Sequence, residues 1–460
     1  MDKTKWVTGI LILLFMVAMP IQLIHGQPGK KLSLDECIEI ALKNNSQLKN
    51  AERDIALSGA DITTARSALL PNIDASFSSG RYIQGPRLRK YDVPVGIDTL
   101  TGNIIYEQKD ISQSKTERNS HRASVELTQT VWDWGKSWNR LTQARLMQDN
   151  AEYKLIGQRN SVIYNVQEKY FELLKAIKLG KVYEEAVKRS EEQLNRTQSM
   201  YEIGAVALAD VYKAKVALGN DQINLINQNN TIIIARANLN YAMGIDPNSP
   251  TEIQEIESGR LEMPFTIESA WALSQEKNPD IKRYELMLKN YQYAVRNARL
   301  AYLPSIYGYV SYSRDNEYFD RVYNSKLDEN YVASLGLQMN LNIFKGLADH
   351  AELSRQKINY AKAEEELIER KRLLKVEVTQ AFNVLKANRE IIEINKTNLV
   401  AANEDLRLAQ ERYKIGAGTL LEVIDAQLAV TQAQSALVSA EYNFQIALSY
   451  LKLLVNALQE

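Results

Sequence analysis

The chain has 460 residues, and its 56 basic residues are balanced by 56 acidic ones. A chain without net charge creates no field that attracts a polyanion, so the composition argues against nucleic acid as a partner. The single cysteine, Cys37, excludes an internal disulfide, and three histidines without a nucleophile or metal motif argue against catalysis and a metal site. We therefore expect neither an enzyme nor a bound cofactor.

The N-terminus is typical of a secretory signal peptide. Lys3 and Lys5 precede an apolar stretch over residues 6–19, and Gly26 comes directly before polar residues. This pattern predicts a signal peptide over residues 1–26. An uncleaved membrane anchor is the alternative, although the apolar stretch is shorter than the about 20 residues that a spanning helix needs. No later run is long and apolar enough for such a helix, so we expect an exported protein.

In the first half of the mature chain, the sequence pattern predicts two strands flanked by helices. Alternation of apolar and small polar residues over 73–78 and 125–131 predicts strands with one apolar face. The polar segment between them, about residues 83–120, predicts a long exposed loop. Pro71 ends the helix before the first strand. The helices of this half are predicted at residues 34–44, 46–69, 137–201 and 207–243.

The second half repeats this order. Residues 34–48 resemble residues 267–281, and Leu70-Pro71 returns as Leu303-Pro304. Strands are predicted at 306–312 and 335–341, with an exposed loop at 316–330 and helices at 266–277, 279–302, 348–413 and 419–456. A duplicated unit explains this recurrence. The first repeat would span residues 27–250, with a β-hairpin at 72–132 and a helical hairpin at 137–243, and the second residues 251–460, with hairpins at 305–343 and 348–456.

The longest predicted helices are too long and too polar for an ordinary domain. At 1.5 Å per residue each would reach roughly 100 Å. Apolar residues step by three and four along a narrow seam, as in Leu399, Ala402, Leu406, Ala409 and Tyr413. This is coiled-coil spacing, and the small residues in it permit close helix approach. Such helices need neighbours on both flanks, some of them from other copies of the chain.

The predicted strands raise the question of how an exported chain could enter a membrane. Without spanning helices, it can cross a bilayer only as a closed β-barrel, since open strand edges cannot be satisfied in lipid. Four strands are too few to close a usable barrel, whereas three copies would give 12. Trp132, Trp134 and Trp138 follow the second strand. They predict either a buried aromatic knot or an aromatic girdle at the membrane interface.

Two short segments connect the long helices. Tyr201-Glu202-Ile203-Gly204 returns as Tyr413-Lys414-Ile415-Gly416. A glycine that closes one helix just before another begins predicts the tip of a helical hairpin. We expect left-handed backbone at both glycines.

Together these features resemble the TolC family of outer-membrane efflux proteins over essentially the whole mature chain. The specific marks are the duplicated half, Leu-Pro before the first strand of each half, the segments 132–135 and 344–346, and the Tyr-x-x-Gly tips. The resemblance implies a mainly α fold with a small β part. Three copies would share a 12-stranded outer-membrane β-barrel continuous with a periplasmic α-helical barrel. It also implies a passive exit duct for efflux or type I secretion, docked on a periplasmic adaptor and an inner-membrane transporter.

The resemblance also assigns residues at the tips. Glu422 and Asp425, three residues apart on one helix face, match the acidic pore constriction of the family, although helix-start acids are an alternative reading. Asp210 and Tyr413, with Tyr201, fall where the family has a gate latch. The family often has a basic residue where this chain has Gly418, so we expect a weaker or differently built closure, through Tyr413 and Asp210 alone. Gly204, Gly416 and Gly418 are assigned to the tip and to adaptor contact.

An alternative from another class is an exported coiled-coil scaffold without a pore, with the strands as a small soluble sheet. Heat-modifiable trimers in outer-membrane fractions would favour the channel, and release by salt or alkali would favour the scaffold. Neither the exported substrate nor the identity of the adaptor follows from the sequence.

Overall fold

The computed structural model describes residues 31–255 and 261–458, so the predicted signal peptide over residues 1–26 lies outside them. The described chain forms two compact units. One contains the residues before Asn45, residues 166–255 and Ile394–Tyr442, and the other contains Asn45–Asn165, residues 261–393 and residues 443–458. Each unit therefore includes segments from both halves of the sequence.

The short helices form where the sequence predicts them. Asn45 and Asn278 have extended backbone, and each side-chain oxygen accepts two backbone N–H groups of the helix that follows. These caps satisfy donors that a helix start leaves free. The four helices are α1 (Leu34–Asn44), α2 (Ser46–Ser67), α5 (Ile267–Lys277) and α6 (Pro279–Leu300).

The long helices are also confirmed, within two residues at each end. They are α3 (Lys136–Glu202), α4 (Leu208–Ala242), α8 (Ala348–Lys414) and α9 (Leu420–Leu454). The helices α3 and α8 both have 67 residues, and α4 and α9 both have 35. Among the described residues, no helix combines the length and apolar character needed to cross a membrane.

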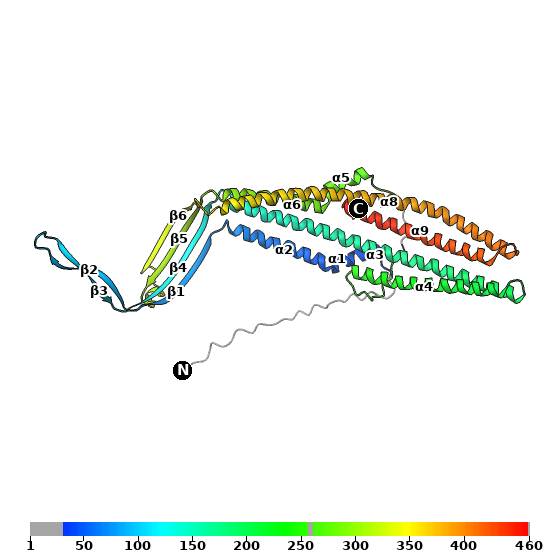
Figure 1. Ribbon diagram of the computed structural model, residues 1–460, viewed down its shortest axis with the longest axis horizontal. Helices are drawn as coiled ribbons and strands as arrows, with labels where there is room; N and C mark the ends of the chain where they lie inside the picture. Colours follow the sequence, from blue (N-terminus) through cyan, green and yellow to red (C-terminus); the bar gives the residue numbers. More distant parts are fainter. Residues whose placement is uncertain (1–30, 256–260, 459–460) are drawn as a thin grey trace, which may run out of the picture. The chain divides into compact units, whose positions relative to one another are not determined.

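Four strands form one antiparallel sheet in the order β1-β4-β5-β6 (Figure 1). They are β1 (Asn72–Gln84), β4 (Thr116–Trp132), β5 (Ser305–Asn316) and β6 (Tyr331–Asn340). The two predicted hairpins, β1 with β4 and β5 with β6, are present, and β4 also pairs with β5. A four-residue helix, α7 (Phe319–Val322), lies in the predicted loop between β5 and β6.

The prediction of a loop over residues 83–120 is wrong. This segment contains the ends of β1 and β4 and two further strands, β2 (Arg87–Ile97) and β3 (Ile104–Gln113), which form a separate two-stranded sheet. Its turn is built by Asp98, whose N–H donates to the Asn103 carbonyl at 2.8 Å, and by Gly102 at φ +70°. Its many charged residues favour a loop in the sequence pattern, but apolar residues are interspersed among them without regular alternation, and the segment forms an exposed strand pair.

One described segment ties the start of the chain to the connection between the halves. Leu32 forms a parallel bridge with Ile253, and the Tyr170 hydroxyl donates to the Gln254 carbonyl at 2.7 Å. Glu255 accepts from Lys178 and Lys181 of α3, which lowers the pKa of its carboxyl to about 2. These contacts lie in one unit and fix the connection against α3.

Candidate functional site

The four-stranded sheet has one apolar face. The register places Leu127 opposite Ile73 on one side and Val310 on the other, and Val310 opposite Leu335. Because side chains alternate along a strand, these residues share a face with their neighbours two positions away. The outer strands add Phe77, Leu337 and Met339, and all three are exposed.

The opposite face is polar. It carries Ser76, Ser124 and Ser311, and the hydroxyls of Ser76 and Ser124 are 2.7 Å apart across the strands. The Tyr309 phenol crosses Gly336 of the next strand, where an added Cβ would lie 2.7 Å from the hydroxyl oxygen. The sheet is therefore amphipathic, and its apolar face is open, with Leu335 exposed by 82%.

A bulge between Thr130 and Trp132 changes which face the end of β4 presents. After the bulge Trp132 pairs with Ile306, which lies on the apolar face with Val310. A bulge adds one residue to one strand and so shifts the alternation. Trp132 thereby joins the apolar face at the end of the sheet nearest α3.

Aromatic side chains also gather at the other end of the apolar face. Phe77 packs against Tyr323 with ring centroids 4.6 Å apart, and Phe319 of α7 packs against Tyr323 at 4.4 Å. Phe77 pairs with Ala123, which is about nine residues from Trp132, or roughly 30 Å along a strand. If the strand is tilted by roughly 40° from the membrane normal, the distance along the normal between the two aromatic groups is about 23 Å. The apolar band of outer-membrane barrels is about 25 Å tall.

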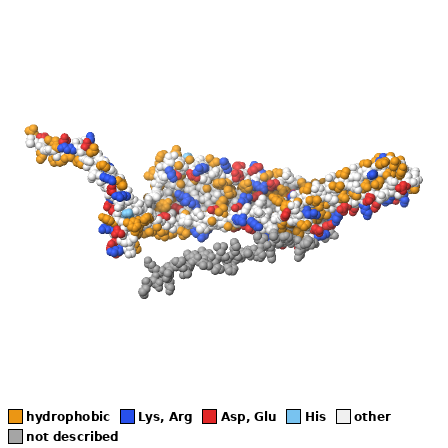
Figure 2. All heavy atoms as spheres, turned by 90° about the horizontal axis from the view of Figure 1, so that it is seen from below, with side chains coloured by type: hydrophobic (Ala, Val, Ile, Leu, Met, Phe, Trp, Pro, Cys, Tyr) orange, Lys and Arg blue, Asp and Glu red, His pale blue; other side chains and the backbone are white. Residues whose placement is uncertain are grey.

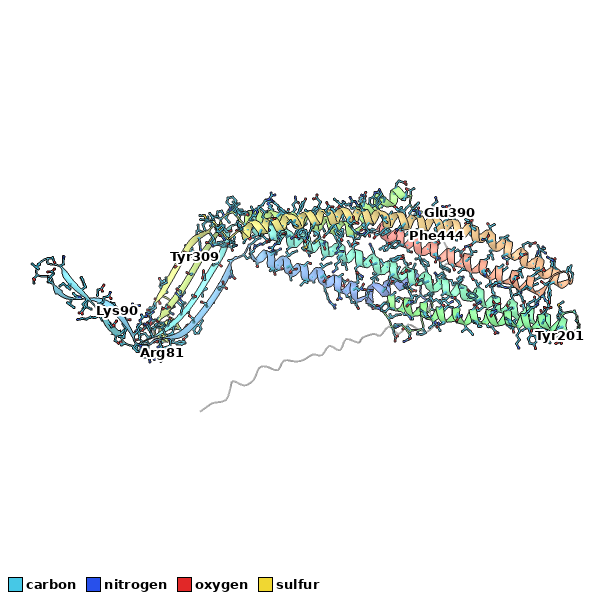
Figure 3. All side chains as sticks on the ribbon, viewed as in Figure 1. Arg81, Lys90, Tyr201, Tyr309, Glu390 and Phe444 are labelled. Atoms are coloured by element: carbon cyan, nitrogen blue, oxygen red, sulfur yellow. The ribbon has the colours of Figure 1, made fainter. Side chains whose placement is uncertain are left out.

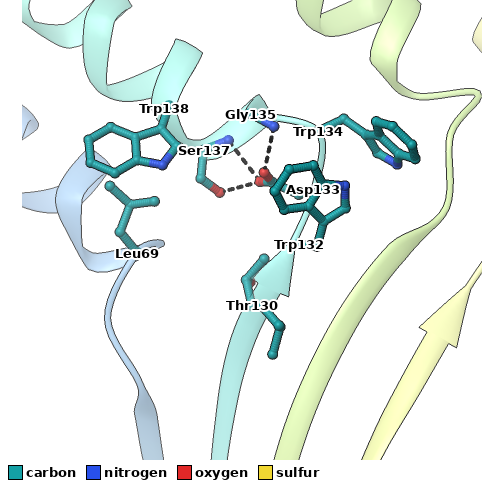
Figure 4. Close-up of a pocket in the computed structure, with 9 residues that line it drawn as sticks. Leu69, Thr130, Trp132, Asp133, Trp134, Gly135, Ser137 and Trp138 are labelled. Carbon is teal, nitrogen blue, oxygen red and sulfur yellow. Dashed lines mark hydrogen bonds between the residues drawn. The ribbon is translucent and has the colours of Figure 1, made fainter.

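The tryptophans line a pocket of about 520 Å³ where β4 meets α3 (Figure 4). Asp133 starts α3 by accepting from Gly135 N–H at 3.0 Å and Ser137 N–H at 2.8 Å. Trp134, at φ +60°, donates from Nε1 to the Pro304 carbonyl at 2.8 Å. Trp132 and Trp138 are exposed by 54% and 62%, so the predicted buried knot is wrong for a single chain.

The two hairpin tips share one backbone design. Gly204 and Gly416 have φ of +77° and +74°, which confirms the predicted left-handed backbone. At the first tip Ala205 N–H donates to the Met200 carbonyl, and at the second Ala417 N–H donates to the Arg412 carbonyl, both at 2.8 Å. This is the Schellman closure that ends a helix on a left-handed glycine.

Beneath the tips, residues of the predicted seam are buried. Leu406, Ala409 and Tyr413 of α8 pack with Val423 of α9 and Ala214 of α4. Tyr413 is only 5% exposed, and among the described residues its hydroxyl has no hydrogen-bond partner. A buried hydroxyl without a partner is costly. Because its own chain covers this hydroxyl, a partner can reach it only if the tip rearranges.

The predicted gate residues are not all joined within one chain. The Asp210 carboxylate pairs with Lys213 at 3.2 Å, not with Tyr413. Tyr201 is partly exposed, and exposed Asp425 has no partner among the described residues. No hydrogen bond therefore joins Asp210 to Tyr413 within the described chain, and the latch stays a prediction.

Arg412 is a further tip residue, one that the sequence pattern does not single out. Its guanidinium lies 3.5 Å from the Glu422 carboxylate and donates to the Ala417 carbonyl at 3.2 Å. Gly418 makes room for this pair, because an added Cβ would lie 3.1 Å from Arg412 Cβ and 3.2 Å from Glu422 Oε2. A signal was present, since Arg412 is the last basic residue before Tyr413 and Glu422 stands at the start of the following helix.

A known protein family matches the sequence that forms this sheet and these helical hairpins. A family profile described as "Outer membrane efflux protein" matches residues 37–245 and 272–457, which together are most of the chain. The chain belongs to the outer membrane efflux protein family.

Relatives in this family align along nearly the whole chain. The "Outer membrane protein TolC" of Salmonella enteritidis is 22% identical over 440 residues, covering 93% of this chain and 82% of the relative. The "Proteases secretion protein PrtF" of Dickeya chrysanthemi is 20% identical over 448 residues, covering 95% and 91%.

Solved structures share the fold. The CmeC outer membrane channel of Campylobacter jejuni aligns with a TM-score of 0.75 at 19% identity, covering 93% of this chain and 87% of that chain. The open-state MtrE outer membrane channel of Neisseria gonorrhoeae has the same TM-score and identity, covering 92% and 89%. At these identities the likeness describes the fold alone.

Proposed function

We propose that this efflux protein is a passive outer-membrane channel, the exit duct of an efflux or type I secretion system. The observation that carries the proposal is the exposed apolar face of the β1-β4-β5-β6 sheet, bounded by aromatic residues at both ends. An apolar face of this size would be a liability in water, whereas hydrocarbon covers it without cost. Family membership supports an outer-membrane location and a conducting role rather than catalysis.

Among the described strands, β1 and β6 are the unpaired edges of the sheet, and lipid cannot satisfy them. Three copies joined edge to edge would make a closed 12-stranded barrel, and the long helices would form a periplasmic helical barrel. Equal lengths of α3 and α8 support the duplicated protomer, with repeats at 27–250 and 251–460. The polar face, with its serines and Tyr309, would then line the lumen.

The hairpin tips would form the periplasmic gate. With three copies around one axis, Asp425 and Glu422 would make a carboxylate ring that attracts cations. Because Arg412 partly neutralises Glu422 in the chain, unpaired Asp425 would contribute most of the negative field. The cost of burying the Tyr413 hydroxyl without a partner supports a closure in which the tip rearranges, and in which Tyr413, Tyr201 and Asp210 take part.

The partners would be a periplasmic adaptor and an inner-membrane transporter, which dock at the tips through the segments around Gly204, Gly416 and Gly418. Strain-free left-handed glycines keep these loops short, so each tip presents backbone groups close to its surface. The alternative, a coiled-coil scaffold, leaves the apolar face of the sheet without a covering element, and family membership does not favour it.

Reconstitution of the purified protein in planar lipid bilayers tests the proposal. We expect heat-modifiable trimers and discrete channels with a preference for cations. The double variant Glu422→Ala, Asp425→Ala should lose this preference, while Glu276→Ala, which removes an exposed acid of α5, should keep it. Absence of channels and trimers would reject the channel, and unchanged selectivity in the double variant would reject the gate assignment alone.

A further inference from the structure

The pair of strands β2 and β3, with its turn, forms a ribbon (residues 87–113), and no other strand of the described residues pairs with it. Figure 2 shows hydrophobic side chains along it, mixed with basic and acidic ones. Leu100 at the turn is 95% exposed, although the Asp98 carboxylate accepts from Leu100 N–H at 2.9 Å and orders the turn. A lone two-stranded hairpin is marginally stable in water, so this one needs a partner surface. Its exposed apolar residues are Leu88, Tyr91, Val95, Ile97, Leu100, Ile104, Ile105, Tyr106 and Ile111.

Both edges of the ribbon are free. Among the described residues β2 pairs only with β3, so the outer side of each strand presents unpaired backbone groups. The ribbon follows β1 after Gly85-Pro86 and precedes β4, at the end of the sheet opposite α2 and α3. Long unpaired edges are usually blunted or paired.

The two edges carry complementary charges. Arg87, Arg89 and Lys90 lie on β2, where Asp92 is the one acid, and β3 carries Glu107 and Asp110 against Lys109. Within the ribbon Lys90 is opposite Asp110 (Figure 3 labels Lys90). If β3 of another copy lay antiparallel along the free edge of β2, a second acid could approach Lys90 from the other side, which favours the contact.

We propose that the ribbons of three copies pair edge to edge, β2 of each with β3 of the next, to form a six-stranded ring. The inference rests on the proposed trimer. Such a contact joins two different edges, and a three-fold rotation closes it without leaving a free edge. Because the diameter of a barrel grows with its number of strands, a ring of six would narrow the channel mouth on the side away from the helices.

Disulfide trapping between copies tests the ring. Two differently tagged chains are co-expressed, one with Asp92→Cys and the other with Gln108→Cys, which are opposite each other within the ribbon. Because the two cysteines lie in different chains, a disulfide reports contact between copies. To allow for a shifted register, the second cysteine is also placed at Tyr106 and Asp110 in turn. Cys37 is buried, so it does not compete.

In the matched controls, both chains carry Asp92→Cys or both carry Gln108→Cys. If the ring exists, we expect the yield of cross-linked dimers in at least one mixed pair to be about tenfold higher than in these controls. Failure of all three mixed pairs, or equal cross-linking of like pairs, would overturn the ring. The same membranes are assayed for heat-modifiable trimers and for channels. Trimers and channels without mixed cross-links reject the ring alone, whereas their absence rejects the proposed function.

Discussion

Substitution of Leu335 by arginine tests which face of the sheet meets lipid. Leu335 lies four residues from Tyr331 and four from Met339, so about 13 Å of strand separates it from either end of the apolar face. An arginine near the bilayer midplane costs about 2–4 kcal/mol on the lipid face. Three copies would therefore lose about 6–12 kcal/mol if the effects add. Ser334→Arg is the matched control, because Ser334 lies one residue away on the polar face.

The assay is the fraction of each variant that reaches outer membranes as heat-modifiable trimer. We expect Leu335→Arg to assemble at least about tenfold less than the parent protein, since each 1.4 kcal/mol corresponds to a factor of ten. Ser334→Arg should assemble within about twofold, because a charge facing a water-filled lumen is tolerated. Equal assembly of the two variants, or a greater loss in Ser334→Arg, would refute the assignment of the apolar face to lipid.

Three further predictions concern the helical part. A Cβ added at Gly416 would have no atom within 4 Å, so Gly416→Ala should destabilise the tip only through the strain of left-handed backbone, about 1–2 kcal/mol. Amide hydrogen exchange at the tip should be faster in this variant and unchanged in the control Ala417→Ser. Arg412→Gln should raise cation selectivity in reversal-potential measurements with little effect on thermal stability, because an exposed pair contributes about 0–1 kcal/mol; lower selectivity would contradict the pairing. The ionised Glu255 carboxylate, with its lowered pKa, stabilises the fold above the ordinary pKa of 4.5, and this is lost as the pH falls toward about 2. The melting-temperature deficit of Glu255→Gln at pH 7 should therefore shrink by pH 3, and a constant deficit would contradict the linkage.

The helices could be predicted closely because local chemistry fixes their ends. Asn45 and Asn278 cap helix starts, and Pro71 prevents a helix from continuing into β1. Gly204 and Gly416 each end a helix through left-handed backbone, which few other residues adopt readily. In each case one or two adjacent residues are enough to predict where the helix begins or ends.

The ribbon and the tip ion pair could not be predicted in the same way. Strands β2 and β3 lack a clean apolar face, because charged residues such as Lys90 interrupt the alternation, and pairing between strands is not a local property. Contact between Arg412 and Glu422 depends on the path of the chain around Gly418. The bulge before Trp132 reverses the alternation at a point where the sequence contains neither glycine nor proline.

The two hairpin tips share a backbone but differ in their ion pairs, and this difference favours the second hairpin as the place of the proposed gate. In the first hairpin Asp210 is paired with Lys213 within its own helix. In the second hairpin Glu422 is paired across the tip with Arg412, and Asp425 is left unpaired. Tyr413, whose buried hydroxyl has no hydrogen-bond partner in the described part of the chain, is also in the second hairpin. If three chains surround a lumen, movement of the second hairpin would therefore move the unpaired Asp425 carboxylate, whereas Asp210 in the first hairpin is already neutralised by Lys213.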